Sequence, residues 1–200
     1  MSKYIFFTGA PGSRWSGVSQ VFRDNWVDID NSDLVPEKTY KHHLYSGHIG
    51  NYYGPGMLYG DWLANKFGTK DLWDAEITAS YDGPNPVKLV MSHHFAYWLD
   101  DFALTFPGSP MVLCYRTDQE CYDWWHEAGG WDISYPNYSW YQNNEIMLQE
   151  IQKQNACILA FADKHQLVLE QPDTDFFRKN FDVDVDFKFT KDVLVAVYYA

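Results

Sequence analysis

The sequence has few cysteines, few basic residues and no long apolar run, and each shortage excludes a class of protein. Its three cysteines, Cys114, Cys121 and Cys157, are irregularly spaced, which argues against a disulfide framework or a zinc site and favours a reducing compartment. There are 15 Lys and Arg against 27 Asp and Glu, so the formal charge of −12 disfavours nucleic acid and anionic membranes as partners. No segment approaches the roughly 20 apolar residues of a membrane span, and the N-terminus does not resemble a secretory signal. We therefore expect a cytoplasmic protein without a membrane anchor.

Apolar and aromatic residues, by contrast, are abundant, at 46% and 18% of the chain. This composition excludes disorder, and 200 residues suffice for one domain, expected to span 1–200. Residues 28–86 are rich in Gly, Pro, Asp, Asn and Tyr, which predicts irregular structure with one helix near 61–67. This segment is a candidate insertion on the acceptor side of a site. It includes His42, His43 and His48, whose spacing fits no standard zinc pattern.

Continuous apolar runs alternate with helical patterns along the rest of the chain. Buried strands are predicted at 4–8, 87–91 and 111–115, and helices at 16–23, 96–106, 118–126 and from Asn143 or Asn144 to about His165. The alternating residues 182–187 predict an exposed strand. Strands buried on both faces are typical of parallel sheets, so we expect an α/β fold with a mostly parallel central sheet flanked by helices.

Polar residues follow each of the three predicted buried strands. The first strand ends in a glycine-rich turn, the second in the pair His93 and His94, and the third in Arg116. Ligands of open α/β sheets bind beyond the carboxyl ends of the strands. We therefore predict that these groups meet in one site.

The turn after the first strand has the context of a phosphate-binding loop. Backbone N–H groups of such a loop and of the following helix form a concave site for an anion. The Walker A pattern is met at Gly9 and Ser16, but Arg14 and Trp15 stand where its second glycine and its lysine belong. The missing lysine disfavours an ATPase or kinase. A Gly-Pro turn without a ligand is the structural alternative.

With these residues in view, the chain resembles the PAPS-dependent sulfotransferases, which transfer a sulfuryl group from 3′-phosphoadenosine-5′-phosphosulfate (PAPS). The loop Pro11–Ser16 is similar to the family's 5′-phosphosulfate loop, although Gly12 replaces its basic residue and Arg14 stands two positions later. His93 follows a strand, as the family's base does. Arg116 ends a strand, as the family's 3′-phosphate ligand does, and Trp124 occupies the position of the serine that shares this phosphate. The similarity covers roughly 3–25 and 87–126.

The resemblance implies a P-loop-type three-layer fold, PAPS as the cofactor, no metal, and a small-molecule or saccharide acceptor. It implies that the catalytic residues are His93, as the base, and Arg14, which neutralises charge on the bridging oxygen. The residues that it implies for PAPS binding are Gly9, Pro11, Gly12, Ser13, Arg14, Trp15, Ser16, Arg116 and Trp124.

Other interpretations of the same residues stay open at this stage. Arg116 could neutralise its acidic neighbours, and either histidine could be a hydrogen-bonded core residue. Two other functions also fit the loop. One is a nucleoside or nucleotide kinase-like enzyme that uses ATP and Mg²⁺, and the other is a degenerate domain that binds a nucleotide or a protein partner without catalysis.

Overall fold

The structure is a computed structural model that describes residues 3–25, 40–41, 49–50, 67–81, 86–132, 143–186 and 192–199. The strands of the central sheet are β1 (Tyr4–Gly9), β4 (Lys88–Met91), β5 (Met111–Tyr115) and β6 (Leu194–Tyr198), and β2 (Tyr40–Lys41) pairs with β3 (Ile49–Gly50). The helices are α1 (Trp15–Asn25), α3 (Lys70–Ala79), α4 (Leu99–Thr105), α5 (Asp118–Glu127), α6 (Asn144–Lys164) and α7 (Thr174–Phe181). Two short 3₁₀ helices are η2 (His93–Trp98) and η3 (Gly130–Asp132).

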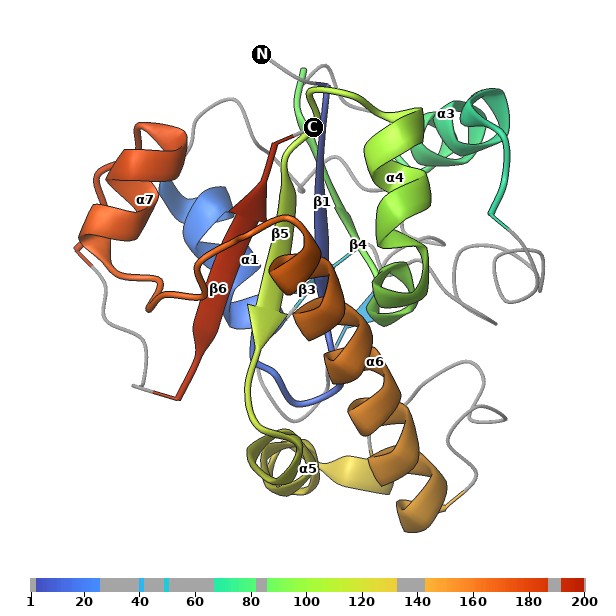
Figure 1. Ribbon diagram of the computed structural model, residues 1–200, viewed down its shortest axis with the longest axis vertical. Coiled ribbons are helices and arrows are strands. Elements are labelled where there is room, and N and C mark those ends of the chain that lie inside the picture. The colour runs from blue at the N-terminus through green and yellow to red at the C-terminus, as the bar shows by residue number, and fades with distance from the viewer. Residues whose placement is uncertain are drawn as a thin grey trace.

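The central sheet has the strand order β4-β1-β5-β6 (Figure 1). β1 pairs in parallel with both β4 and β5, and β6 closes the sheet antiparallel to β5. Phe7 lies opposite Met91, and Gly9 lies opposite Cys114. The segments that follow β1, β4 and β5 therefore leave the sheet at the same edge. The predicted α/β fold with a mostly parallel sheet is confirmed.

Helices cover both faces of this sheet. Successive side chains of β1 point to opposite faces, so alternate residues of β1 pack against different helices. Ile5 and Phe7 lie in a core cluster with α1 and α7, while Tyr4 and Phe6 lie in a second cluster with α3, α4 and α6. In Figure 1, α1 and α7 accordingly stand on one side of the strands, and α4 and α6 on the other. β1 is thus packed on both faces. This packing fixes the position of the β1–α1 loop, on which the candidate site is built.

Several described elements were not predicted, among them α3, α7 and β6. α3 falls within residues 28–86, which the composition predicted to be irregular apart from one helix. Its first turn is capped by the Thr69 side chain, which accepts a hydrogen bond from the Leu72 N–H, and Trp73 and Ile77 are fully buried. β6 was missed although Leu194–Tyr198 is an apolar run like those of the predicted strands; only its pairing with β5, about 80 residues earlier, carries no local signal.

The predicted strand at 182–187 is wrong over its described part. Residues 182–186 form no strand, and the backbone at Asp182 turns into the left-handed region to end α7. Val183 and Val185 are nevertheless buried against the α1 side of the sheet, so the alternation did separate inward from outward side chains. The predicted helix at 96–106 is split into η2 and α4. Most of the predicted helix at 61–67 and the histidines of 42–48 lie outside the described residues.

Candidate functional site

The candidate site is built on the loop between β1 and α1. Gly12 and Arg14 both adopt positive φ angles, of 81° and 61°, and the Ser13 N–H donates to the Ala10 carbonyl at 3.0 Å. The Arg14 carbonyl accepts from the N–H groups of Gly17 and Val18 at 2.9 and 3.2 Å, so that α1 begins directly after it. The first N–H groups of a helix have no acceptor within the helix. This loop therefore aims the positive end of α1 at the carboxyl edge of the sheet.

Two buried donors in the loop have no acceptor among the described residues. The Ser13 side chain is fully buried, and its Oγ lies over Gly9, where a Cβ would come within 2.4 Å of it. The Nε–H of Arg14 is also buried without a partner. A buried donor without an acceptor is costly in a native protein, by about 1–3 kcal/mol. An oxyanion is the kind of acceptor that both groups lack.

Arg14 stacks on a tryptophan from a different element. Its guanidinium carbon lies 3.7 Å from the ring centroid of Trp124, which α5 carries. Such a contact with an aromatic face stabilises a cation without consuming its hydrogen-bond donors. The structure therefore brings together two of the residues predicted for the cofactor site, and Trp124 holds the Arg14 cation beside the loop.

His93 lies against the loop as the sequence predicted. Its Nδ1 is 2.5 Å from the Gly9 carbonyl oxygen, and its ring is 4.5 Å from the ring of Trp15, centroid to centroid. Because a carbonyl can only accept, Nδ1 must carry the proton. In the neutral ring Nε2 is then the basic nitrogen, and this is the tautomer that a general base at this position needs. Trp15 itself is 4% exposed and belongs to the core, so its side chain packs against the His93 ring from the core side.

His94, the next residue of η2, takes the other orientation and is buried, with 6% of its surface exposed. Burial lowers the pKa of His94 from 6.5 to about 4, and the nearby carboxylate of Glu150 raises it only in part. Glu150 accepts hydrogen bonds from Tyr97 Oη and Lys153 Nζ, both at 2.6 Å. The sequence left open which histidine faces the loop; His93 does, and His94 is a core residue.

His94 should make the folded state sensitive to acid. The pKa of His94 is lower in the folded state than in the unfolded state. Between pH 6.5 and about 4, His94 is therefore protonated in the unfolded chain but not in the native chain. The free energy of unfolding is therefore expected to fall by about 3 kcal/mol as the pH drops through this window. Below the window, His94 is protonated in both states and causes no further loss. Denaturant unfolding of the wild type and of His94→Gln at pH 7, 6, 5 and 4 measures the difference, because other titrating groups affect both proteins alike. Parallel pH profiles for the two proteins would contradict this expectation.

Arg116 lies next to the loop and is buried, with 6% of the residue exposed. Its Nη1 donates to the Gly12 carbonyl at 3.1 Å, and its Nη2 forms an ion pair with Asp192, just before β6. Its Nε–H is buried without a partner among the described residues. The structure thus joins Arg116 to the loop, as predicted, but also gives it a carboxylate partner. Asp192 was missed because it lies 76 residues away in sequence, beside a strand that was not predicted.

The remaining predicted residues support the loop mostly through the backbone. Gly9 pairs with Cys114 at the end of β1, and Pro11 is buried. The Ser16 carbonyl accepts from Ser19 Oγ at 2.8 Å within α1. No group of three or more His, Cys, Asp or Glu side chains in the described ranges could hold a metal ion.

Fold and site together define the class: an α/β protein whose strand–loop–helix turn, two arginines and one histidine meet at the carboxyl edge of a mostly parallel sheet. Comparisons with known protein families, with curated proteins and with solved structures found no match. Among the described helices, none is both long and apolar enough to cross a lipid bilayer.

Proposed function

We propose that this protein is a PAPS-dependent sulfotransferase with a P-loop-type fold, which transfers a sulfuryl group to a hydroxyl or amine acceptor. One observation carries the proposal. Three buried donors in or beside the loop, Ser13 Oγ, Arg14 Nε and Arg116 Nε, have no acceptor among the described residues. Phosphate and sulfate oxygens are acceptors only, and they favour guanidinium partners.

In this mechanism the loop backbone and the start of α1 bind the 5′-phosphosulfate, and Arg116 contributes to binding the 3′-phosphate. The acceptor hydroxyl oxygen attacks the sulfur, and the bond from sulfur to the bridging phosphate oxygen breaks. The products are a sulfate ester and 3′-phosphoadenosine-5′-phosphate (PAP). The hydroxyl proton passes to Nε2 of His93, and Arg14 offsets the charge that develops on the bridging oxygen. Positioning and electrostatic stabilisation supply the rest of the rate enhancement.

The first test is binding of PAP, measured as a thermal shift and compared with ATP plus Mg²⁺. A ligand that binds only the native state adds about 2.7 kcal/mol of stability at a hundredfold excess over its Kd. A shift with PAP alone is expected. A shift only with ATP and Mg²⁺ would favour the kinase-like alternative, and no shift with either would favour a domain without catalysis.

Arg14→Ala should weaken PAP binding by about tenfold or more, because it removes one charged contact to the anion. Arg178→Ala is the matched control, since Arg178 is an exposed arginine on α7 that pairs only with surface aspartates among the described residues. Isothermal titration of both variants with PAP measures the effect. Equal affinities in the two variants would refute a role for Arg14 in the site.

Asp192→Asn should strengthen PAP binding by several-fold while it lowers stability by about 1–3 kcal/mol. The substitution removes the carboxylate that shares Arg116 with the proposed anion, and with it a charged hydrogen bond of the folded state. The same titration, together with denaturant unfolding, separates the two effects. Unchanged affinity combined with lower stability would mean that Arg116 only holds the loop to β6.

A further inference from the structure

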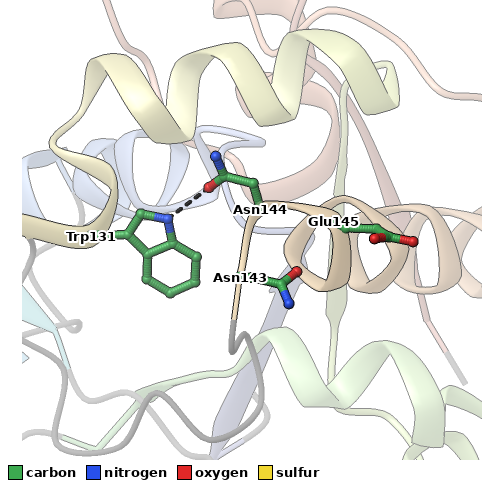
Figure 2. Close-up of a pocket in the computed structure, with 4 residues that line it drawn as sticks. All are labelled: Trp131, Asn143, Asn144 and Glu145. Atoms are coloured by element: carbon green, nitrogen blue, oxygen red, sulfur yellow. Dashed lines mark hydrogen bonds between the residues drawn. The ribbon is translucent and has the colours of Figure 1, made fainter.

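An open hollow of about 500 Å³ lies where α6 begins, and Trp131, Asn143, Asn144 and Glu145 line it (Figure 2). The tryptophan comes from η3, and the other three residues come from the start of α6. The hollow is widely open to solvent, so a ligand there would rest on the surface and would not be enclosed. None of the loop residues lines it among the described residues, so it is a separate feature from the anion site.

Trp131 is held in a fixed orientation while part of its ring stays accessible. Its Nε1–H donates to Asn144 Oδ1 at 2.7 Å, the contact drawn as a dashed line in Figure 2. Its ring meets that of Trp125 edge to face, with centroids 4.9 Å apart. The residue is 37% exposed, so part of its ring can meet a ligand. A rigid aromatic surface of this kind offers contact area at low entropic cost.

Polar groups surround this aromatic surface, and the only charge among the described lining residues is negative. Asn143 and Asn144 offer side-chain amides, although the Asn143 oxygen already caps α6 by accepting from the Ile146 N–H. Glu145 is exposed next to them, and its carboxylate points away from Trp131 (Figure 2) and accepts from Gln149 Nε2 at 3.3 Å. Amides donate to and accept from hydroxyl groups, whereas the carboxylate repels anions and attracts amines.

We propose that this hollow binds a pyranose sugar that is neutral or carries an amino group. A pyranose presents C–H groups on a ring face, which suit an indole, and hydroxyl groups around its rim, which suit amides and carboxylates. Glu145, the one charged residue among the described lining residues, disfavours uronic acids and sulfated sugars as ligands of this hollow.

The position of the hollow suits an acceptor site. Trp125, which supports Trp131, shares an apolar cluster with Ala10 of the loop. In Figure 1 the start of α6 and the β1–α1 loop lie at the same end of the molecule. The role of the sugar as acceptor rests on the proposed function, but sugar binding itself does not.

The test is a titration with methyl glycosides, followed by the indole N–H signals of ¹⁵N-labelled protein. Methyl glucosaminide and methyl glucoside should shift the Trp131 signal, and methyl glucuronide should bind more weakly than either. Trp131→Ala should weaken glucoside binding by about tenfold or more. Tyr199→Ala is the control, because it removes another half-exposed aromatic ring, beside the C-terminus at the opposite end of the molecule. Glu145→Gln should abolish the preference for the amino sugar and leave glucoside binding unchanged.

Three results would overturn this inference: no response to any of the three sugars, equal glucoside binding in Trp131→Ala, or tightest binding of the glucuronide. A loss of PAP affinity in Trp131→Ala would also overturn it, because the hollow would then hold the adenine ring. Failure of the proposed function is a different result, namely sugar binding at Trp131 without any binding of PAP.

Discussion

Replacing Gly12 by alanine is expected to lower the free energy of unfolding by about 2–5 kcal/mol. The backbone at Gly12 has a φ of +81°, which costs a residue with a side chain about 1–2 kcal/mol. A Cβ at this position would also lie 1.8 Å from the Cys121 carbonyl oxygen and 2.7 Å from its carbonyl carbon. These atoms belong to the backbone of α5, which cannot move aside as a side chain would. Overpacking of this kind adds about 1–3 kcal/mol.

The chain offers a matched control in Gly108, whose φ is +79° and whose Cβ would meet nothing within 4 Å. Gly108→Ala therefore carries the backbone strain without the clash, and we expect it to cost only about 1–2 kcal/mol. Denaturant unfolding of both variants at pH 7 measures the difference. Equal losses of stability would show that the loop does not pack against α5 as closely as the structure has it. Because Ala10 shares a cluster with Cys121 and Trp125, Gly12→Ala should also weaken PAP binding by displacing the loop.

Replacing His93 by asparagine is expected to lower kcat by about 10²–10⁴-fold, the usual contribution of a general base. Asparagine can still donate an N–H to the Gly9 carbonyl, as Nδ1 of the histidine does, but it has no basic nitrogen. Binding of PAP should therefore change little, because the loop stays in place. The expected change is in kcat and not in PAP affinity. This combination distinguishes a general base from a residue that only supports the loop.

The assay follows release of PAP from PAPS with and without an acceptor, and titration with PAP measures binding in parallel. His126→Asn serves as the control, since His126 is an exposed histidine on α5. If His93→Asn and the wild type turn over at the same rate, His93 is not the base. If His93→Asn loses PAP binding and activity together, its role is to position the loop.

The local sequence was sufficient to predict the elements that carry strong periodic or continuous apolar patterns. β1, β4 and β5 are short runs of apolar residues that end in polar or glycine-rich turns, and α6 has a capping asparagine followed by a long amphipathic pattern. The parallel arrangement follows from these elements, because buried strands separated by helices pair that way. The same rule predicted that the loop, His93 and Arg116 would meet at one edge, as the contacts of His93 and Arg116 with the loop confirm.

Contacts between distant segments were decided only by the tertiary structure. Trp124 lies 110 residues from Arg14, and their stacking depends on how α5 packs against the loop. The pairing of Arg116 with Asp192 needs β6 beside β5, and strand pairing across about 80 residues leaves no periodic trace in either segment. The sequence by itself determined which groups could bind an anion, because residue types and strand ends are local properties. Which of those groups are already paired, buried or turned toward one another depends on packing between elements, and packing is a property of the whole fold.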